Sequence, residues 1–201
     1  MQRIAHMRRE LKQSTAKLEE LNILLQQQAN EDGLTKLYNR RYMDTKLEES
    51  IAWHGRRNIP MTVILLDVDF FKPYNDNYGH IQGDKCLQGL ASTLKQLFVR
   101  AGEFVGRYGG EEFVLVLSDT DGTAAKLHAT RIKKALHEMN YAHDHSSVSD
   151  RVTASQGVLS FVPAGGESIA SIYEKVDQAL YQAKQSGRNT FIQRSILELA
   201  G

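Results

Sequence analysis

The stretch Arg107–Phe113 constrains the fold of this chain more than any other, because it combines two glycines, two acids and the start of an apolar run. A two-residue type I′ turn needs positive φ at both central positions, and glycine reaches such values without steric cost. With strand-like residues on both sides, Gly109 and Gly110 therefore predict the turn of a β-hairpin. Glu111 and Glu112 are then expected at the hairpin tip.

The residues after the tip form a predicted strand that is apolar on both faces. Phe113, Leu115 and Leu117 share one face, while Val114 and Val116 share the other, so this strand is expected in the interior of a sheet. Two carboxylates at the mouth of such a strand repel each other unless hydrogen-bond donors or a cation, commonly a divalent metal, compensate them. On the hairpin alone, a solvated charged turn is the simpler interpretation.

Composition limits the class of protein. The 201 residues are 41% hydrophobic, which suffices for one domain with a full core plus an appendage, and the single Cys86 excludes an intrachain disulfide and gives no indication of a zinc site. A formal net charge of +1 gives no basic field for nucleic acid or an anionic membrane. No apolar run approaches the roughly 20 residues of a bilayer span. We therefore expect a cytoplasmic domain, while a membrane anchor further upstream in a full-length protein stays open.

Residues 1–30 carry an apolar repeat every seven residues among charged and amide side chains. The repeat comprises Ile4, Leu11, Leu18 and Leu25, with Met7, Ser14, Leu21 and Gln28 three positions on. This spacing predicts a coiled coil, although the polar members of the second set leave open a single helix lying on its own domain. We expect this helix to be a linker from an upstream sensory domain, and to end where Asn30 and Gly33 allow a left-handed turn.

The rest of the chain alternates helix and strand patterns. Helices are expected up to about residue 54 and at 84–98, 123–139 and 169–186, and strands at 61–68, 152–161 (interrupted by Gly157) and 190–192. Candidate core contacts are Tyr42, Leu47, Ile51 and Trp53 in the first of these helices and Ala124, Leu127, Ile132 and Leu136 in the third. This order predicts a mixed α/β sheet with helices packed against it. The expected division is a helix at 1–30, a domain at 31–195 and a tail at 196–201.

A second group of acids ends the buried strand at 61–68. If that strand pairs beside the hairpin strand, Asp67, the carbonyl of Val68, Asp69 and Glu111 converge at one place. Hard oxygen ligands of this kind suit Mg²⁺ or Mn²⁺, and two such ions can stabilise both the attacking and the leaving oxygen of a phosphoryl displacement. The glycine patterns of P-loop and Rossmann phosphate sites are absent from the sequence.

Four segments together are similar to the GGDEF-domain diguanylate cyclases. They are Asp32-Gly33-Leu34-Thr35 with the following Asn39-Arg40-Arg41, the run from Asp67 to Asp84, Arg107–Phe113, and the run from Ala179 to Asn189. The resemblance covers about residues 29–193. It implies a palm-like fold related to nucleotide cyclases and polymerases, with a mostly antiparallel central sheet. It also implies the condensation of two GTP molecules into cyclic di-GMP with release of two pyrophosphates.

The resemblance assigns roles to individual residues. Asp67, the Val68 carbonyl, Glu111 and Glu112 match metal ligands for two Mg²⁺ or Mn²⁺ ions per GTP site, and Glu111 is also a candidate for helping to deprotonate the attacking 3′-hydroxyl. The resemblance implies that Asn75 and Asp84 bind the guanine, with His80 beside them. The amides of Phe70 and Phe71 and the side chain of Lys72 are implied to bind the β- and γ-phosphates. Lys184 and Arg188 are implied to bind the phosphate tail.

Several of these assignments have alternatives. Lys184 and Arg188 lie four residues apart, which would place them on one helical face, but they also suit ordinary cations near a helix C-terminus. His80 equally suits a capping or packing histidine, and Asp69 can serve only to position its loop. Where many relatives carry Arg-x-x-Asp for product inhibition, this chain has Arg100 and Glu103, so we expect weakened feedback inhibition.

The implied reaction requires two facing domains, because each binds one GTP, so a homodimer joined through residues 1–30 is expected. The main alternative is a catalytically silent GGDEF domain that binds GTP or cyclic di-GMP as a regulatory module. Synthesis of cyclic AMP or cyclic GMP by the same fold is a weaker alternative, since a nucleotide attacking itself needs no domain pairing.

Overall fold

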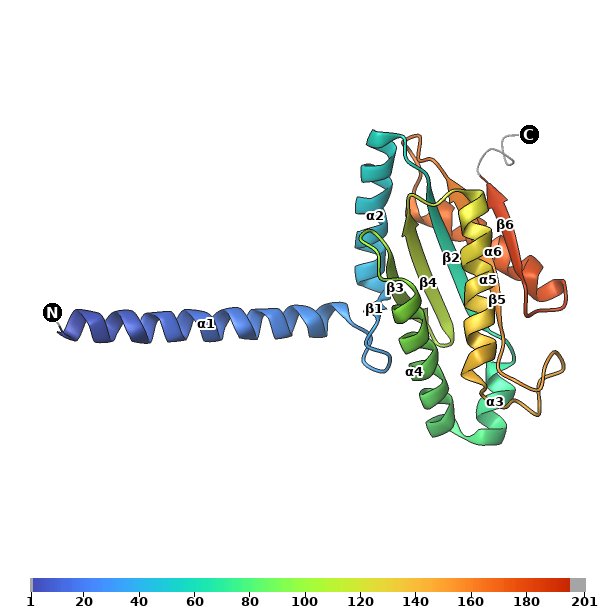
Figure 1. The fold of residues 1–201 in the computed structure, drawn as a ribbon, viewed down its shortest axis with the longest axis horizontal. Helices are drawn as coiled ribbons and strands as arrows, with labels where there is room; N and C mark the ends of the chain where they lie inside the picture. Colours follow the sequence, from blue (N-terminus) through green and yellow to red (C-terminus); the bar gives the residue numbers. More distant parts are fainter. Residues whose placement is uncertain (1, 196–201) are drawn as a thin grey trace.

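The fold is described from a computed structural model, which places residues 2–195 (Figure 1). The predicted tail at 196–201 and the side chain of Ile4 in the heptad pattern lie outside the described residues. The helices are α1 (Gln2–Asn30), α2 (Arg40–Arg57), α3 (Phe71–Tyr78), α4 (His80–Leu97), α5 (Gly122–Met139) and α6 (Ile169–Gln185). The strands are β1 (Tyr38–Asn39), β2 (Met61–Val68), β3 (Phe104–Gly109), β4 (Glu112–Ser118), β5 (Ala154–Phe161) and β6 (Phe191–Ser195).

One sheet joins these strands in the order β1-β3-β4-β2-β5-β6. The three central pairings, β3 with β4, β4 with β2 and β2 with β5, are antiparallel, while the short outer pairings are parallel. The mixed, mostly antiparallel sheet expected from the sequence is therefore present. The hairpin strand β4 lies inside the sheet, and β2, which carries Asp67, lies beside it.

Both faces of the sheet are covered by helices, which explains why its strands read as continuous apolar runs. On one face α3, α4 and α5 pack over alternate residues of the strands, including Ile64, Phe113 and Leu115. On the other face α2 and α6 pack over the remaining residues, including Val63 and Val114. The predicted alternation along β4 is confirmed by this division of its side chains between two cores (Figure 1).

Four predicted core contacts are wrong, since Tyr42 and Ala124 are only half-buried and belong to neither core, and two others are exposed. Trp53 is 40% exposed and lies under the guanidinium of Arg57, whose Cζ is 4.3 Å from the ring centre. Leu127 of α5 is 67% exposed. In α2 the buried positions are instead Met43, Leu47, Ser50, Ile51 and His54, because the inward face of the helix lies slightly to one side of the apolar stripe that the sequence suggests.

The expected interruption of the strand at Gly157 is wrong. Gly157 lies within the continuous strand β5. A Cβ atom at this position would lie 2.1 Å from the carbonyl oxygen of Val176 and 2.5 Å from the amide nitrogen of Leu180. The glycine therefore allows the backbone of α6 to approach the sheet closely. A strand can contain glycine for this reason as well as to form a bulge or a bend.

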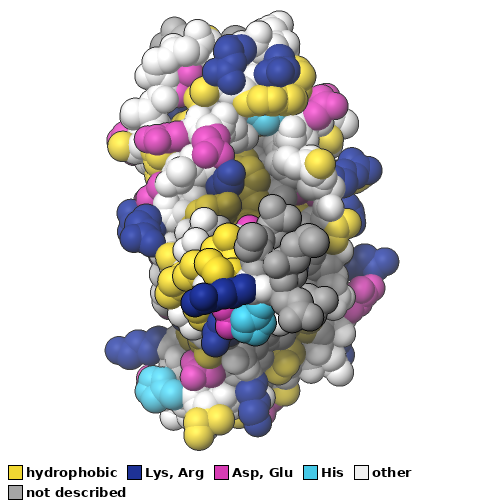
Figure 2. All heavy atoms as spheres, turned by 90° about the vertical axis from the view of Figure 1, so that its left-hand side faces the viewer, with side chains coloured by type: hydrophobic (Ala, Val, Ile, Leu, Met, Phe, Trp, Pro, Cys, Tyr) yellow, Lys and Arg dark blue, Asp and Glu magenta, His cyan; other side chains and the backbone are white. Residues whose placement is uncertain are grey.

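Helix α1 extends away from the sheet and its covering helices (Figure 1). Leu11, Leu18 and Leu25 are 61–69% exposed along it, so α1 does not lie on its own domain. In the view from the side of α1, exposed hydrophobic side chains gather near the centre (Figure 2). The helix ends at Asn30 as expected, but without the predicted left-handed turn, because neither Asn30 nor Gly33 has positive φ. Among residues 2–195, no helix has the length and apolar character needed to cross a bilayer.

We predict that Gly157→Ala lowers the free energy of unfolding by at least about 2 kcal/mol, because backbone atoms of α6 would have to move away from the added methyl group. The expected fall in melting temperature is about 4–8 °C, measured by thermal denaturation followed by circular dichroism.

Gly33→Ala is the matched control, because a Cβ at Gly33 would meet no atom within 4 Å. It should shift the melting temperature by no more than about 1–2 °C. Equal melting temperatures for the two variants would contradict the close packing of α6 on β5.

Candidate active site

The hairpin turn differs from the predicted one. Gly109 pairs with Glu112, so the two turn residues are Gly110 and Glu111, and only Gly110 has positive φ, at 50°. The type I′ turn centred on both glycines was therefore wrong, because a register shift between Arg107 and Gly109 moves the turn one residue along the chain. As a result Glu111 occupies the turn itself, while Glu112 is the first residue of β4.

The expected convergence of the two acidic segments is present in the sheet. Asp67, near the end of β2, stands directly opposite Glu112 in the antiparallel register. The amide of Val68 donates to the carbonyl of Glu111 at 3.3 Å, which ties the turn to the end of β2. The carboxylates of Asp67, Glu111 and Glu112 and the Val68 backbone therefore lie at one edge of the sheet, where β2 ends and β4 begins.

The electrostatics of this edge are unfavourable without a further cation. Burial raises the pKa of Asp67, as do the charges of Glu111 and Asp69, although the ammonium of Lys184, 2.9 Å from Oδ2, opposes the shift. Burial and the neighbouring Asp67 likewise raise the pKa of Glu112. Within residues 2–195, no three His, Cys, Asp or Glu side chains are already arranged around one metal position. Any ion here would have to draw on these carboxylates together with a backbone carbonyl.

Asp69 differs from Asp67 in that its hydrogen-bonding capacity is used inside the protein. Its side chain is 2% exposed and accepts hydrogen bonds from the hydroxyls of Thr153 and Ser155, at 2.8 and 2.7 Å, and from the amide of Asn189 at 3.0 Å. Three donors compensate one buried charge. The arrangement favours the interpretation that Asp69 positions its surroundings, because it fixes the loop after α6 against the end of β2.

The predicted guanine pair lies on two successive helices. Asn75 belongs to α3 and Asp84 to α4, and a Cβ on the intervening Gly83 would lie 1.8 Å from Oδ1 of Asn75. This oxygen is buried and has no hydrogen-bond partner among the described residues, while Asp84 is exposed. His80, the first residue of α4, is exposed as well. A buried acceptor without a partner beside an exposed carboxylate suits the edge of a bound base.

The predicted phosphate contacts surround the turn between β2 and α3. Phe70 is the N-cap of α3 and Lys72 in its first turn is exposed. Arg188 places its guanidinium over the Phe70 ring, with Cζ 4.6 Å from the ring centre. The argument that Lys184 and Arg188 share one helical face was wrong, because α6 ends at Gln185 and Arg188 has a φ of 63°. Lys184 instead pairs with Asp67.

At the expected product site, the carboxylate of Glu103 accepts a hydrogen bond from the backbone amide of Arg100 at 3.0 Å. The amide of Glu103 donates in return to the carbonyl of Arg100 at 3.0 Å. Both side chains belong to the turn before β3, and the Arg100 side chain is exposed. The carboxylate of Glu103 is thus already used locally.

Two residues for which the sequence suggested no role connect α1 with the hairpin. Arg107 donates to the carbonyl of Gly110 at 2.9 and 2.7 Å and to the carboxylate of Asp32 at 3.1 Å. Asp32 also accepts from the amide and hydroxyl of Thr35, each at 2.8 Å. These bonds outweigh burial and lower the pKa of Asp32. The Asp-x-x-Thr spacing is a capping pattern that could have indicated this turn.

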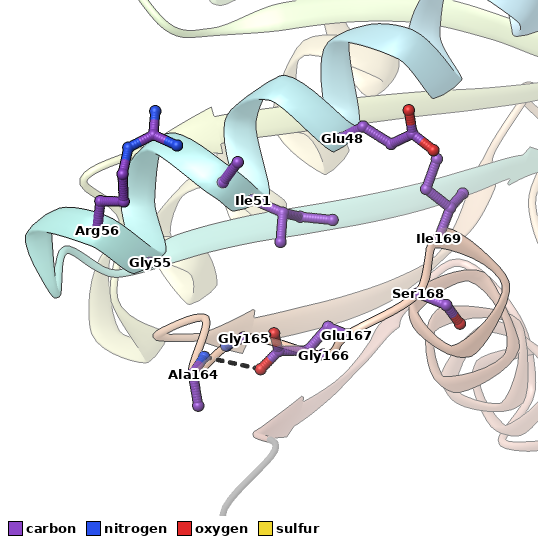
Figure 3. Close-up of a pocket in the computed structure, with 11 residues that line it drawn as sticks. Glu48, Ile51, Gly55, Arg56, Ala164, Gly165, Gly166, Glu167, Ser168 and Ile169 are labelled. Carbon is purple, nitrogen blue, oxygen red and sulfur yellow. Dashed lines mark hydrogen bonds between the residues drawn. The ribbon is translucent and has the colours of Figure 1, made fainter.

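A cleft of about 620 Å³ lies elsewhere, between α2 and the loop before α6 (Figure 3). Ile51 and Ile169 line it, and the carboxylate of Glu167 is occupied by the amides of Ala164 and Gly165, at 2.8 and 3.0 Å. None of the converging acids at the end of β2 lines this cleft, so we place the candidate active site at the sheet edge.

Comparison with known proteins identifies the family of the chain. A family model described as "Diguanylate cyclase, GGDEF domain" matches residues 29–190. The chain belongs to the GGDEF domain family. This GGDEF domain chain is 37% identical over 171 residues to diguanylate cyclase A of Treponema denticola, which covers 84% of the chain and 45% of that relative. It therefore spans less than half the length of this relative.

Solved structures show the same fold. The coiled coil and GGDEF domain of DgcB from Caulobacter crescentus, in complex with c-di-GMP, superposes with a TM-score of 0.77 and 30% identity, covering 94% of this chain and 99% of that one. The active GGEEF domain of a diguanylate cyclase from Vibrio cholerae gives a TM-score of 0.67 and 35% identity over 78% of this chain and 97% of that one.

We predict that Glu112→Gln stabilises the metal-free GGDEF domain at pH 7. The raised pKa means that the folded state disfavours the ionised carboxylate, so Glu112 costs stability above its folded pKa and this cost disappears as the pH falls below about 4. Because Glu112 is half-buried, we expect a modest gain of about 1–3 °C in melting temperature at pH 7.

The measurement is thermal unfolding in EDTA at pH 7 and pH 4, where the gain should vanish. Glu174→Gln, at an exposed position of α6, is the control and should change neither value. A lower melting temperature for Glu112→Gln at pH 7 would show that Glu112 is not under electrostatic strain.

Proposed function

We propose that this GGDEF domain is a diguanylate cyclase that condenses two GTP molecules into cyclic di-GMP and two pyrophosphates. The observation that carries the proposal is the placement of Asp67 opposite Glu112, with Glu111 in the adjoining turn, at the edge of a buried sheet in a chain of this family. The relatives named for this activity and the neighbour bound to c-di-GMP support it.

The residues present fit a divalent metal. Burial and the charges of neighbouring carboxylates raise the pKa values of Asp67 and Glu112, and a bound cation would relieve that repulsion. Asp67, the carbonyl of Val68, Glu111 and Glu112 would hold Mg²⁺ or Mn²⁺, with two ions as the expected complement. When bound, such ions supply charge stabilisation for the attacking and leaving oxygens.

The remaining steps belong to side chains of the protein. Glu111 is exposed enough in its turn to accept a proton from the ribose 3′-hydroxyl, and in the proposal it does so as the hydroxyl attacks the α-phosphate of the second GTP. Asn75 and Asp84 hold the guanine edge, while Lys72 and the amides of Phe70 and Phe71 hold the β- and γ-phosphates. Lys184, paired with Asp67 in the structure, would exchange this partner for the phosphate tail when GTP binds.

Two further elements of the proposal concern assembly and feedback. The exposed leucines of α1 would pair two chains and bring their GTP sites face to face, under control of a sensory domain upstream. Feedback by cyclic di-GMP would be weak, because the carboxylate of Glu103 is bonded to the backbone of Arg100 rather than free for a ligand.

The proposal is tested by incubating the full chain with GTP and Mg²⁺ and separating the nucleotides by chromatography. Cyclic di-GMP should appear, and Glu111→Gln should lower the rate at least about a hundredfold, because it removes the proposed base and a metal ligand. The surface variant Glu174→Gln should retain the wild-type rate. If GTP stayed intact while the protein still bound nucleotide and Glu111→Ala changed nothing, the chain would be a regulatory module instead.

We also predict that α1 sets the concentration at which the enzyme works. Removing residues 1–28 spares Ala29, whose carbonyl accepts from the side chains of Asn39 and Arg41 at 2.8 and 3.0 Å. The truncated chain, and the triple variant Leu11→Gln, Leu18→Gln and Leu25→Gln, should lose at least about fivefold in rate per domain at low protein concentration. Both should recover as the concentration rises.

The control for this prediction is the double variant Lys12→Gln and Glu19→Gln, which keeps the net charge and the leucines. It should follow the wild-type concentration dependence. An unchanged rate per domain for the truncated chain at the lowest concentration would rule out pairing through α1.

A further inference from the structure

The turn that bears the proposed phosphate-binding amides contains a strained residue. Phe70 has φ 54° and ψ 33°, in the left-handed helical region that bulky side chains disfavour. Such a conformation persists only where neighbouring groups hold it. Whatever holds Phe70 therefore also fixes the direction of the amides of Phe70 and Phe71.

His143 contacts this turn from a loop 73 residues further along the chain. Its Nε2 lies 3.1 Å from the carbonyl oxygen of Phe70, which also accepts from the amide of Tyr74 at 3.0 Å. The imidazole stands edge-on to the Tyr74 ring, with centres 5.1 Å apart and an interplanar angle of 89°. The loop itself is fastened to α3, because the amide of Asp144 donates to the hydroxyl of Tyr78 at 3.0 Å.

The chemistry of this contact defines the form of the imidazole. A carbonyl oxygen can only accept, so Nε2 must carry the proton. His143 is 1% exposed, and its Nδ1 is buried without a hydrogen-bond partner among the described residues. Burial also lowers the pKa of His143, although the Phe70 carbonyl opposes this shift. The ring is therefore neutral, with an Nε2–H donor and a bare Nδ1.

Packing alone does not account for a histidine at this position. A buried nitrogen without a partner costs stability that an apolar ring of similar size would avoid. The one favourable polar contact of the His143 side chain in the described structure is with the Phe70 carbonyl. On the other side of Phe70, the guanidinium of Arg188 covers the aromatic ring, so the strained residue is held at both its backbone and its side chain.

We propose that His143 is a positioning residue of the phosphate site, whose Nε2–H fixes the Phe70 carbonyl and so aims the amides of Phe70 and Phe71 at the β- and γ-phosphates of GTP. The inference rests on the proposed function, since that function assigns the phosphates to these amides. His143 itself touches no substrate. Its contribution is to binding of the triphosphate tail and not to recognition of the base.

The test measures the preference of the protein for a triphosphate over a monophosphate. Isothermal titration calorimetry with Mg²⁺ compares 3′-deoxy-GTP and 3′-deoxy-GMP, neither of which can react because the attacking hydroxyl is missing. His143→Leu should reduce the ratio of the two affinities about five- to tenfold, as expected for one lost hydrogen bond. His143→Gln keeps a donor at a similar reach and should retain the ratio within about twofold.

Two controls separate positioning from folding. His145→Leu changes an exposed histidine in the same loop and should leave the ratio unchanged. Melting temperatures are measured for all variants, because a merely structural role would lower stability and reduce both affinities alike. A stable His143→Leu protein with the wild-type ratio would overturn the inference while leaving the cyclase activity untouched. A wild-type protein without preference for the triphosphate would overturn the proposed phosphate site and the inference with it.

A measurement on the unaltered protein covers the case in which His143→Leu fails to fold. Long-range ¹H–¹⁵N spectra of histidine-labelled protein at pH 7 distinguish the two neutral tautomers and the imidazolium. We expect the Nε2–H tautomer for His143. An Nδ1–H tautomer or a charged ring would remove the hydrogen bond on which the inference depends.

Discussion

The antiparallel pairing of β2 with β4 places two carboxylates face to face where both strands leave the core. Burial raises the pKa of both carboxyls, Asp67 raises that of Glu112 further, and Glu111 and Asp69 raise that of Asp67, while Lys184 compensates only part of the repulsion. Such an arrangement costs folding free energy. It persists because helices cover both faces of the sheet and fix the register of the strands through two continuous apolar cores. The fold therefore stabilises a site that the local electrostatics oppose.

The end of the site at which we propose that phosphates bind depends on loops whose backbone geometry is unusual. Phe70, Arg188 and Asn189 all have positive φ, and they meet near one buried carboxylate, Asp69. Asp69 binds the amide of Asn189, while Arg188 covers Phe70. Residues in this backbone region are strained unless their neighbours hold them. The contacts of Asp69 and His143 thus connect the end of β2 with the loop at His143, with residues 153–155 and with the loop after α6.

Periodicity in the sequence predicted the fold class, the interior position of β4 and both apolar faces, because alternation along a strand is a local property. Local patterns do not show how strands pair or which elements pack against each other, and the wrong predictions are of this kind. A register shift between Arg107 and Gly109 moved the hairpin turn, and Gly157 marked a close helix contact rather than a break. Arg188 lies beyond the end of α6, as the helix expected at 169–186 already implied, so its four-residue spacing from Lys184 did not place the two on one helical face. Trp53 was wrongly expected in the core, because the apolar stripe of a helix does not show which of its side chains face the sheet and which lie at its exposed margin. The contact of His143 with Phe70 spans 73 residues and has no local signal.

Arg107 shares its guanidinium between the turn that follows α1 and the turn that carries Glu111. The guanidinium is planar, so it cannot keep its hydrogen bonds to both Asp32 and the Gly110 carbonyl if these two groups move apart. Arg107 therefore couples the end of the N-terminal helix to the hairpin that carries Glu111. A twist of α1 relative to the sheet must either be transmitted to the hairpin or break a partly buried ion pair.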